Sequence, residues 1–199
     1  MKKIIIYSFF LLLFSNQAFP QTKSVKDMYW DYIQIRMSDS KKQETIAKAL
    51  ELLNHKTELN EKQIANLNYH LGRIYESIDE IKAIPYYEEC IKFSPNYYVP
   101  YLALAAINIK KCNALSAEVN KAGKEKNIPL YKESFTKYKN QVLKTLIYME
   151  KAQACDPDEQ MLDMINKYYS SIKDMQALGM LPERLKKLSE NCATLLDDE

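Results

Sequence analysis

The sequence has very little glycine, with 3 residues in 199, and only 7 prolines. Turn-rich β architectures need far more of both residue types, so this composition disfavours them. Apolar residues instead recur three and four positions apart through most of the chain, which is the spacing of a helix with one buried face. The sequence therefore predicts an all-α fold.

Long hydrophobic runs are also scarce. The longest, Ile4–Phe14, has eleven residues, whereas a membrane-spanning helix needs about 20. Lys2 and Lys3 precede this run and small or polar residues follow it, as in a secretory signal peptide. We predict a signal peptide over residues 1–20, with cleavage after Ala18 fitting as well, and one helical domain over residues 21–199. The protein would then be periplasmic or secreted and keep no membrane span; an uncleaved signal anchor is the alternative.

The chain lacks an excess of charge of either sign. It holds 28 Lys+Arg and 26 Asp+Glu, and Lys2 and Lys3 belong to the predicted signal peptide, so the remainder is neutral. Nucleic-acid binding draws most of its affinity from basic side chains that neutralise phosphates. We therefore expect no nucleic-acid binding.

Residues that carry enzyme chemistry are scarce as well. The 2 histidines, His55 and His70, lack the spacing of a metal-binding motif. There is no Cys-x-x-Cys pair, no glycine-rich phosphate loop and no Gly-x-Ser-x-Gly sequence. Glu88 and Glu89 are adjacent and would point apart on a helix, so they form no glycosidase pair. We expect no catalytic residue, no metal and no cofactor.

The 4 cysteines would ordinarily form two disulfides in an exported protein. The predicted helices argue against this, because they place Cys90 inside one helix and Cys192 well inside the last one. Cys112 and Cys155 would lie in turns at opposite edges of the stack. Bridged cysteines need Cα atoms within about 7 Å of each other, and no pair meets this condition. We therefore expect four unpaired cysteines that pack as small apolar residues.

Apolar spacing and capping residues predict the helix boundaries. Asn60 with Gln63 has the form of a capping box, and Ser94-Pro95 has the form of a cap followed by a first helical residue. Gly123 is expected to end a short helix that begins near Ala114. Helices are expected over about residues 25–37, 114–123, 129–155 and 157–176. Others are expected to begin after residues 38–40, at Asn60, after residues 79–80 and at Pro95, with apolar stripes over 46–53, 64–78, 84–91 and 98–109. The last helix is expected to start at Pro182 and to continue through Leu195.

One stretch carries a recognisable motif. Within Ala65–Tyr97, the sequence has Leu-Gly-x2-Tyr at 71–75, Ala-x3-Tyr at 83–87 and a closing Pro95. This order resembles one unit of the tetratricopeptide repeat (TPR) family, which carries Trp-x2-Leu-Gly-x2-Tyr, then Ala-x3-Phe, then Pro, in about 34 residues. Asn68 stands where the family has tryptophan.

TPR units are helix pairs that bind other proteins. The resemblance implies antiparallel helix pairs stacked as a short TPR-like α-solenoid. Residues 101–117, 146–157 and 165–172 resemble parts of further, degenerate units. Because a stack of at least three units is expected for stability, we expect Val25–Leu53 to pack as an additional divergent pair.

The same resemblance implies a partner-binding surface on the predicted helix 60–78. Its apolar residues define a buried face and leave a separate stripe, which in TPR proteins lines the concave surface and grips peptides. Amide, aromatic and guanidinium groups on this stripe suit a peptide with carboxylates. The alternative is an ordinary solvated helix face. The stripe consists of Asn66, Tyr69, Arg73 and Ser77.

We expect an exported adaptor or scaffold of the cell envelope that binds a protein or peptide, and the sequence leaves its oligomeric state open. The first alternative is a glycan-binding helical protein, because several of the 15 tyrosines cluster between Tyr86 and Tyr101. Tyr86 and Tyr97 are the members expected to be exposed, although packing between helices is the ordinary role of such rings. An envelope enzyme is the third alternative.

Overall fold

The computed structural model describes residues 23–196. The predicted signal peptide over residues 1–20 and the last three residues of the chain therefore lie outside the described part. Within that part the chain forms nine α-helices and no β-strand, which confirms the all-α fold. The structure contains no helix, over these same residues, that combines the length and the apolar character needed to cross a membrane.

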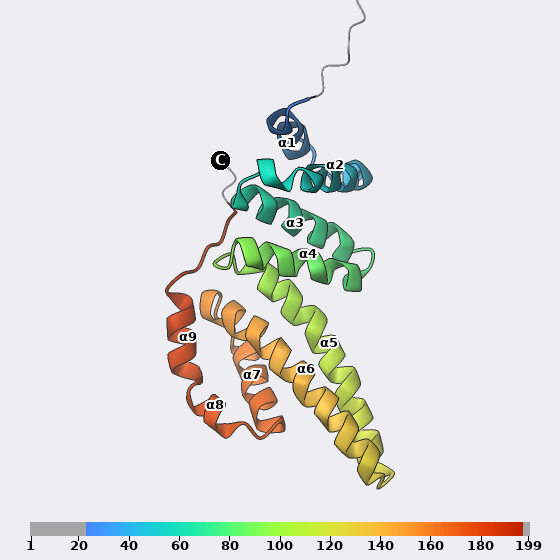
Figure 1. Cartoon of the computed structure of the whole chain (residues 1–199). Coiled ribbons are helices and arrows are strands. Elements are labelled where there is room, and N and C mark those ends of the chain that lie inside the picture. Colours follow the sequence, from blue (N-terminus) through green and yellow to red (C-terminus); the bar gives the residue numbers. More distant parts are fainter. Residues whose placement is uncertain (1–22, 197–199) are drawn as a thin grey trace, which may run out of the picture.

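Successive helices turn back on one another and stack as pairs (Figure 1). In chain order they are α1 (Val25–Ile33), α2 (Lys42–Asn54), α3 (Glu61–Glu76), α4 (Glu80–Phe93), α5 (Val99–Lys124), α6 (Ile128–Cys155), α7 (Glu159–Ser171), α8 (Met175–Gly179) and α9 (Leu181–Ser189). The most extensive packing joins α3 to α4 and α5 to α6, while α7 and α9 cover α6. Two short 3-10 helices, Asp39–Lys41 and Lys56–Glu58, flank α2.

The capping box predicted at the start of α3 is confirmed. Oδ1 of Asn60 accepts a hydrogen bond from the amide of Gln63 at 2.9 Å, and Oε1 of Gln63 accepts one from the amide of Asn60 at 3.0 Å. Because the capping box fixes the first residue of α3, it also helps to fix which side chains of this helix face the core. Leu67 and Leu71 are consequently fully buried, in a core cluster that also contains Tyr32 of α1.

Gly72 allows α3 and α4 to approach closely, as the motif implies. A Cβ atom placed on Gly72 would lie 2.7 Å from two ring carbons of Tyr87 in α4. Tyr87 is almost fully buried, and its hydroxyl donates to Glu76 at 2.5 Å. The ring therefore has no free space into which it could move.

We expect Gly72→Ala to lower the free energy of unfolding by about 1–2 kcal/mol. Overpacking a buried site costs about 1–3 kcal/mol, and the better helix propensity of alanine recovers only part of this. Urea unfolding followed by circular dichroism measures the change. Gly179→Ala is the matched control, since no atom lies within 4 Å of its added Cβ. Equal effects of the two substitutions would contradict the close contact.

The boundaries predicted for α5 are wrong. The sequence predicts one helix from Pro95 and a second over residues 114–123, whereas α5 begins at Val99 and is continuous for 26 residues. Cys112, expected in a turn, is fully buried inside α5, with its Sγ 3.2 Å from Oγ1 of Thr145 in α6. No glycine or proline interrupts residues 101–122, and α5 packs on α6 there, so the helix continues through the predicted turn.

The helix predicted over residues 129–155 is confirmed as α6, whereas the following one begins at Glu159 and not at the predicted Pro157. Asp158 caps α7, and its Oδ1 accepts from the amide of Met161 at 2.7 Å. Lys173 then adopts the left-handed conformation, with φ 59°, which ends the helix before the predicted residue 176. The side chain of Asp174 starts α8 by accepting from the amide of Ala177.

A disulfide joins Cys155 to Cys192, so the expectation of four unpaired cysteines is wrong for this pair. That expectation placed Cys192 inside a helix over residues 182–195, but α9 ends at Ser189. The segment beyond it returns to the end of α6, and the two Cα atoms are 5.5 Å apart. Cys90 and Cys112 are free and buried, as expected. Burial raises the pKa of Cys90 to about 12, so it remains a thiol at neutral pH.

Candidate functional site

The four residues predicted to bind a partner lie on α3, but one of them is not accessible. Tyr69 and Arg73 are partly exposed and Ser77 is exposed, whereas Asn66 has only 2 % of its surface exposed. The hydroxyl of Tyr32 donates to Oδ1 of Asn66 at 3.2 Å. The amide of Asn66 therefore ties α1 to α3, and little of it remains for a partner.

Asn66, Tyr69 and Arg73 line a hollow of about 230 Å³ on the surface of α3, which we call the α3 groove. Three separate parts of the chain complete it: the turn after α1, the connection before α5, and the segment after α9. The groove is therefore assembled by the tertiary fold. Its other lining residues are Arg36, Met37, His70, Tyr97, Leu195 and Leu196.

Aromatic rings form one wall of the groove. Tyr69 contacts His70 and Tyr97 edge to face, with ring centroids 5.2 Å apart in both pairs. Tyr97 is only 5 % exposed, so the expectation that it is exposed is wrong; the connection before α5 folds it onto the fully buried Cys90. This burial raises the pKa of Tyr97, which remains a neutral phenol.

Tyr86, the other tyrosine expected to be exposed, is partly buried. Its ring stacks on Tyr75 with centroids 5.2 Å apart and the planes nearly parallel. One face of the ring is therefore covered by a neighbour. The tyrosines of this region mainly join helices to one another, which was the ordinary role considered from the sequence.

Two arginines give the groove its charge. Arg36 follows α1 and Arg73 lies in the last turn of α3, and both line the α3 groove and a second hollow of about 280 Å³ beside it. Ser77 lines the second hollow, and its hydroxyl donates to the carbonyl of Ile74 at 2.8 Å. Asp39 lines this second hollow as well. Paired guanidinium groups suit the binding of carboxylates.

An extended segment of the chain itself forms one side of the α3 groove. After α9 the backbone crosses to the connection before α5 (Figure 1). There the amide of Ala193 donates to the carbonyl of Asn96 at 2.7 Å, and the amide of Tyr98 donates to the carbonyl of Ala193 at 3.3 Å. Leu195 and Leu196 then line the groove. Leu196 packs against the buried cluster of Ala65, Cys90 and Tyr97.

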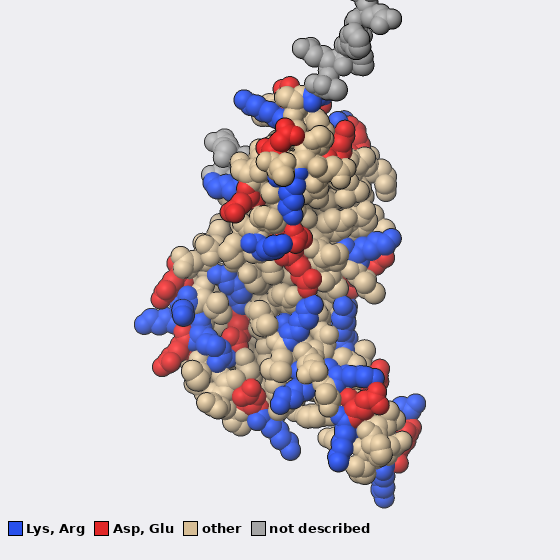
Figure 2. Space-filling model, in the orientation of Figure 1, with Lys and Arg blue, Asp and Glu red and all other residues tan. Residues whose placement is uncertain are grey.

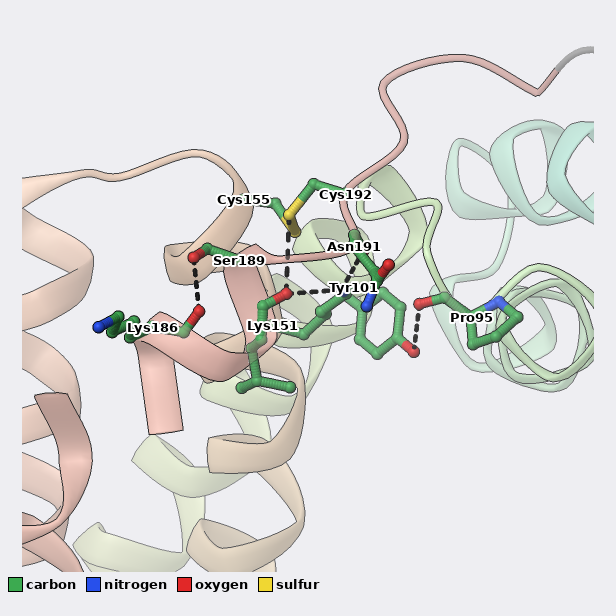
Figure 3. The surroundings of a disulfide bond; sticks show 9 residues. Pro95, Tyr101, Lys151, Cys155, Lys186, Ser189, Asn191 and Cys192 are labelled. Atoms are coloured by element: carbon green, nitrogen blue, oxygen red, sulfur yellow. Dashed lines mark hydrogen bonds between the residues drawn. A yellow bond between two sulfur atoms is a disulfide. The ribbon is translucent and has the colours of Figure 1, made fainter. Parts of the chain in front are cut away.

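Two attachments hold the base of this segment to α6 (Figure 3). Lys151 is 6 % exposed, and its Nζ donates to the carbonyl oxygens of Leu188 at 3.0 Å and Asn191 at 2.7 Å. One turn further along α6, Cys155 forms the disulfide with Cys192. Burial among these carbonyls lowers the pKa of Lys151. Asn191 and Cys192 are therefore held against α6, just before the residues that line the groove.

Charge elsewhere on the surface is mixed. Acidic and basic side chains lie side by side over the face drawn in Figure 2. Within residues 23–196, the histidine, cysteine, aspartate and glutamate side chains form no group of three that could hold a metal ion.

Comparison of the chain with family models, with curated proteins and with solved structures gives no match.

Proposed function

We propose that this protein is an exported, TPR-like adaptor or scaffold of the cell envelope that binds a segment of a partner protein in the α3 groove. The observation that carries this proposal is the extended segment 193–196, which lines one side of the groove and pairs with the backbone of residues 96–98. A surface that accepts one extended segment by backbone pairing and side-chain contacts can accept another of similar chemistry.

The side chains of the groove support the same proposal. Tyr69 offers a partly exposed apolar ring at a small cost in side-chain entropy, which is why tyrosine is common in protein interfaces. Arg36 and Arg73 add planar donor groups that can orient a carboxylate. The groove therefore combines an apolar wall with a positively charged end, and this combination suits a peptide that carries both leucine-like and acidic residues.

We expect a double charge reversal, Arg36→Glu with Arg73→Glu, to abolish partner binding. The tagged protein is crosslinked in its native cells, the captured proteins are identified by mass spectrometry, and the affinity of each purified candidate is then measured. We expect at least a tenfold loss of affinity, because like charges would now face the acidic groups of the partner. Lys137→Glu with Lys167→Glu is the matched control, since both lysines are exposed and lie on α6 and α7, away from the groove.

Two outcomes would contradict the proposal at different levels. If both variants bind the same partner as the wild type, the partner uses another surface and the groove is not the site. If the wild type captures no protein that binds it after purification, the adaptor role itself is wrong. Circular dichroism and thermal unfolding of each variant confirm that the fold is retained.

A further inference from the structure

We propose that the free end of the α5–α6 pair is a membrane-surface site, which inserts apolar side chains among the headgroups of a bilayer rich in anionic phospholipid. This end consists of residues 121–132, which we call the tip. It comprises the last turn of α5, the connecting turn and the start of α6. The tip projects beyond the other helices and away from α3, so this contact is separate from the α3 groove and from the proposed function (Figure 1).

A run of four apolar residues is exposed at the tip. Ile128, Pro129, Leu130 and Tyr131 follow one another at the start of α6. Ile128 is 61 % exposed, and Leu130 and Tyr131 are each 40 % exposed. Because successive residues of a helix are about 100° apart, the four side chains encircle the first turn, and packing against α5 cannot cover them all. An exposed run of this length is unfavourable in water unless it has a function.

The backbone of the tip can enter a headgroup layer with little loss of hydrogen bonding. The amide of Leu130 donates to Oδ1 of Asn127 at 3.1 Å, and the amide of Tyr131 donates to the carbonyl of Asn127 at 2.9 Å. Pro129 has no amide hydrogen. The amide of Asn127 itself donates to the carbonyl of Ala122 at 3.1 Å. Removing polar groups from water is costly mainly where they lack such partners.

The charged side chains of the tip suit an anionic surface. The tip has four lysines and one glutamate, whereas the whole chain is almost balanced, with 28 basic and 26 acidic residues. All four lysines are exposed, and none of them forms an ion pair within residues 23–196. They are Lys121, Lys124, Lys126 and Lys132. Figure 2 shows basic side chains projecting from this end of the molecule, at the lower right.

Lysines closer to the junction with α4 are neutralised instead. Lys110 of α5 pairs with Glu80, and Lys144 of α6 pairs with Glu88 at 2.9 Å. Positive charge along the helix pair is therefore concentrated at the tip. Basic side chains near an anionic lipid surface each add to the attraction. Their long apolar stems let the ammonium groups stay at the phosphates while the neighbouring apolar residues lie deeper.

The size and shape of the tip favour a lipid surface over a second protein. A typical protein interface has about 20–30 residues on each side, whereas the tip has twelve, at a convex end. A convex end can enter a headgroup layer without a matching concave surface. Apolar side chains surrounded by lysines are the combination that binds interfacial segments to membranes, because apolar burial and attraction to anionic lipid act together.

Binding to vesicles tests the proposal. The exported chain is used without residues 1–20 and with its disulfide intact, because the apolar run Ile4–Phe14 would itself bind lipid. One set of vesicles contains equal parts of phosphatidylglycerol and phosphatidylcholine, and the other contains phosphatidylcholine alone. Co-sedimentation measures the bound fraction as lipid is added. We expect at least tenfold tighter binding to the anionic vesicles, which weakens as salt is added because salt screens exposed charges.

Two tip variants separate the apolar from the charged contribution. The first, Ile128→Ser with Leu130→Ser, removes apolar contacts. It keeps Tyr131, because this ring stacks on Phe135 with centroids 6.1 Å apart. Each variant should weaken binding to the anionic vesicles at least tenfold. The second variant carries Lys121→Gln, Lys124→Gln, Lys126→Gln and Lys132→Gln.

Matched controls place the same changes elsewhere. Ile78→Ser with Ile81→Ser removes two isoleucines that are 58 % and 71 % exposed, beside Asp79 and Glu80 in the turn between α3 and α4. A charge control removes four exposed lysines far from the tip. Both controls should bind the anionic vesicles almost as well as the wild type does. The charge control carries Lys41→Gln, Lys82→Gln, Lys92→Gln and Lys187→Gln.

A tryptophan reports whether the tip itself enters the bilayer. Leu130→Trp combined with Trp30→Phe leaves a single indole, at the tip, since the chain has one tryptophan. On the anionic vesicles we expect a blue shift of its emission and quenching by brominated phospholipid. Ile81→Trp combined with Trp30→Phe should show neither change.

Several results would overturn the proposal. They are no binding to the anionic vesicles, equal binding to both kinds, full binding by either tip variant, and unchanged emission of the Leu130→Trp protein on bound vesicles. Light scattering without lipid identifies another occupant: if the wild type is a dimer and the Ile128→Ser, Leu130→Ser variant a monomer, the tip contacts a second copy of the chain. Circular dichroism confirms that each variant keeps its fold.

Discussion

Replacing both Cys155 and Cys192 with serine is expected to lower the free energy of unfolding by about 3–4 kcal/mol, the largest effect we expect of any change. The disulfide links residues separated by 37 positions, and it restricts the unfolded chain much more than the folded one. The loop that it closes contains α7, α8 and α9, so the packing of these helices on α6 depends on it. Urea unfolding of the two proteins, fitted with a common slope, measures the difference.

Reduction provides the matched control for this change. Dithiothreitol should lower the stability of the wild type to that of the double-serine variant, and it should leave the variant unchanged. Thiol counting in denaturant should give two free thiols, those of Cys90 and Cys112, before reduction and four afterwards. Four thiols in the untreated protein would show that the disulfide is not formed.

Arg184→Met is expected to lower the free energy of unfolding by about 3 kcal/mol, because it leaves a buried carboxylate without its partner. Arg184 of α9 holds Glu150 of α6 through Nε and Nη2, at 2.9 and 2.8 Å. The Glu150 side chain is 8 % exposed, while that of Arg184 is 31 % exposed, which places the effect at the lower end of the usual range. Tyr169 donates its hydroxyl to the same carboxylate, and burial raises the pKa of this tyrosine.

A second variant distinguishes the loss of the ion pair from a loss of packing. Replacing both partners, Glu150→Met with Arg184→Met, should recover most of the stability, because no buried charge then remains. Lys167→Met removes an exposed partner of Asp163 and should change the free energy of unfolding by less than about 1 kcal/mol. If the double variant is less stable than Arg184→Met, the carboxylate does not depend on the arginine.

Features that depend only on residues close together in the sequence could be predicted from it. The capping box at Asn60 is local, because side chain and amide lie within three residues of each other, and α3 begins where predicted. The start of α7 lies two residues after the predicted one, because Asp158 and not Asp156 is the cap. The ends of helices were harder to predict from the sequence. Lys173 has no sequence feature that requires a left-handed conformation, and α9 ends at Ser189 although Leu188 and Leu195 continue its spacing.

The same distinction applies to the site. The stripe with Tyr69 and Arg73 follows from the period of α3, whereas Arg36 joins it only because α1 packs on α3 through Tyr32 and Asn66. The segment after α9 that lines the groove was missed because it was assigned to a helix. Cys192 was the available signal, since a disulfide at this residue returns the segment after α9 to the domain.

The long helix pair α5–α6 projects from its junction with α4, so a small rotation at this junction would produce a large displacement at the far end of the pair. Its tip extends beyond the other helices (Figure 1), and α5 alone has 26 residues, a length of about 39 Å at 1.5 Å per residue. A rotation of about 10° at the junction would therefore move the tip by about 7 Å. Ala193 bonds to Asn96 and Tyr98 within this junction, so these two hydrogen bonds connect the segment after α9 to the base of the pair.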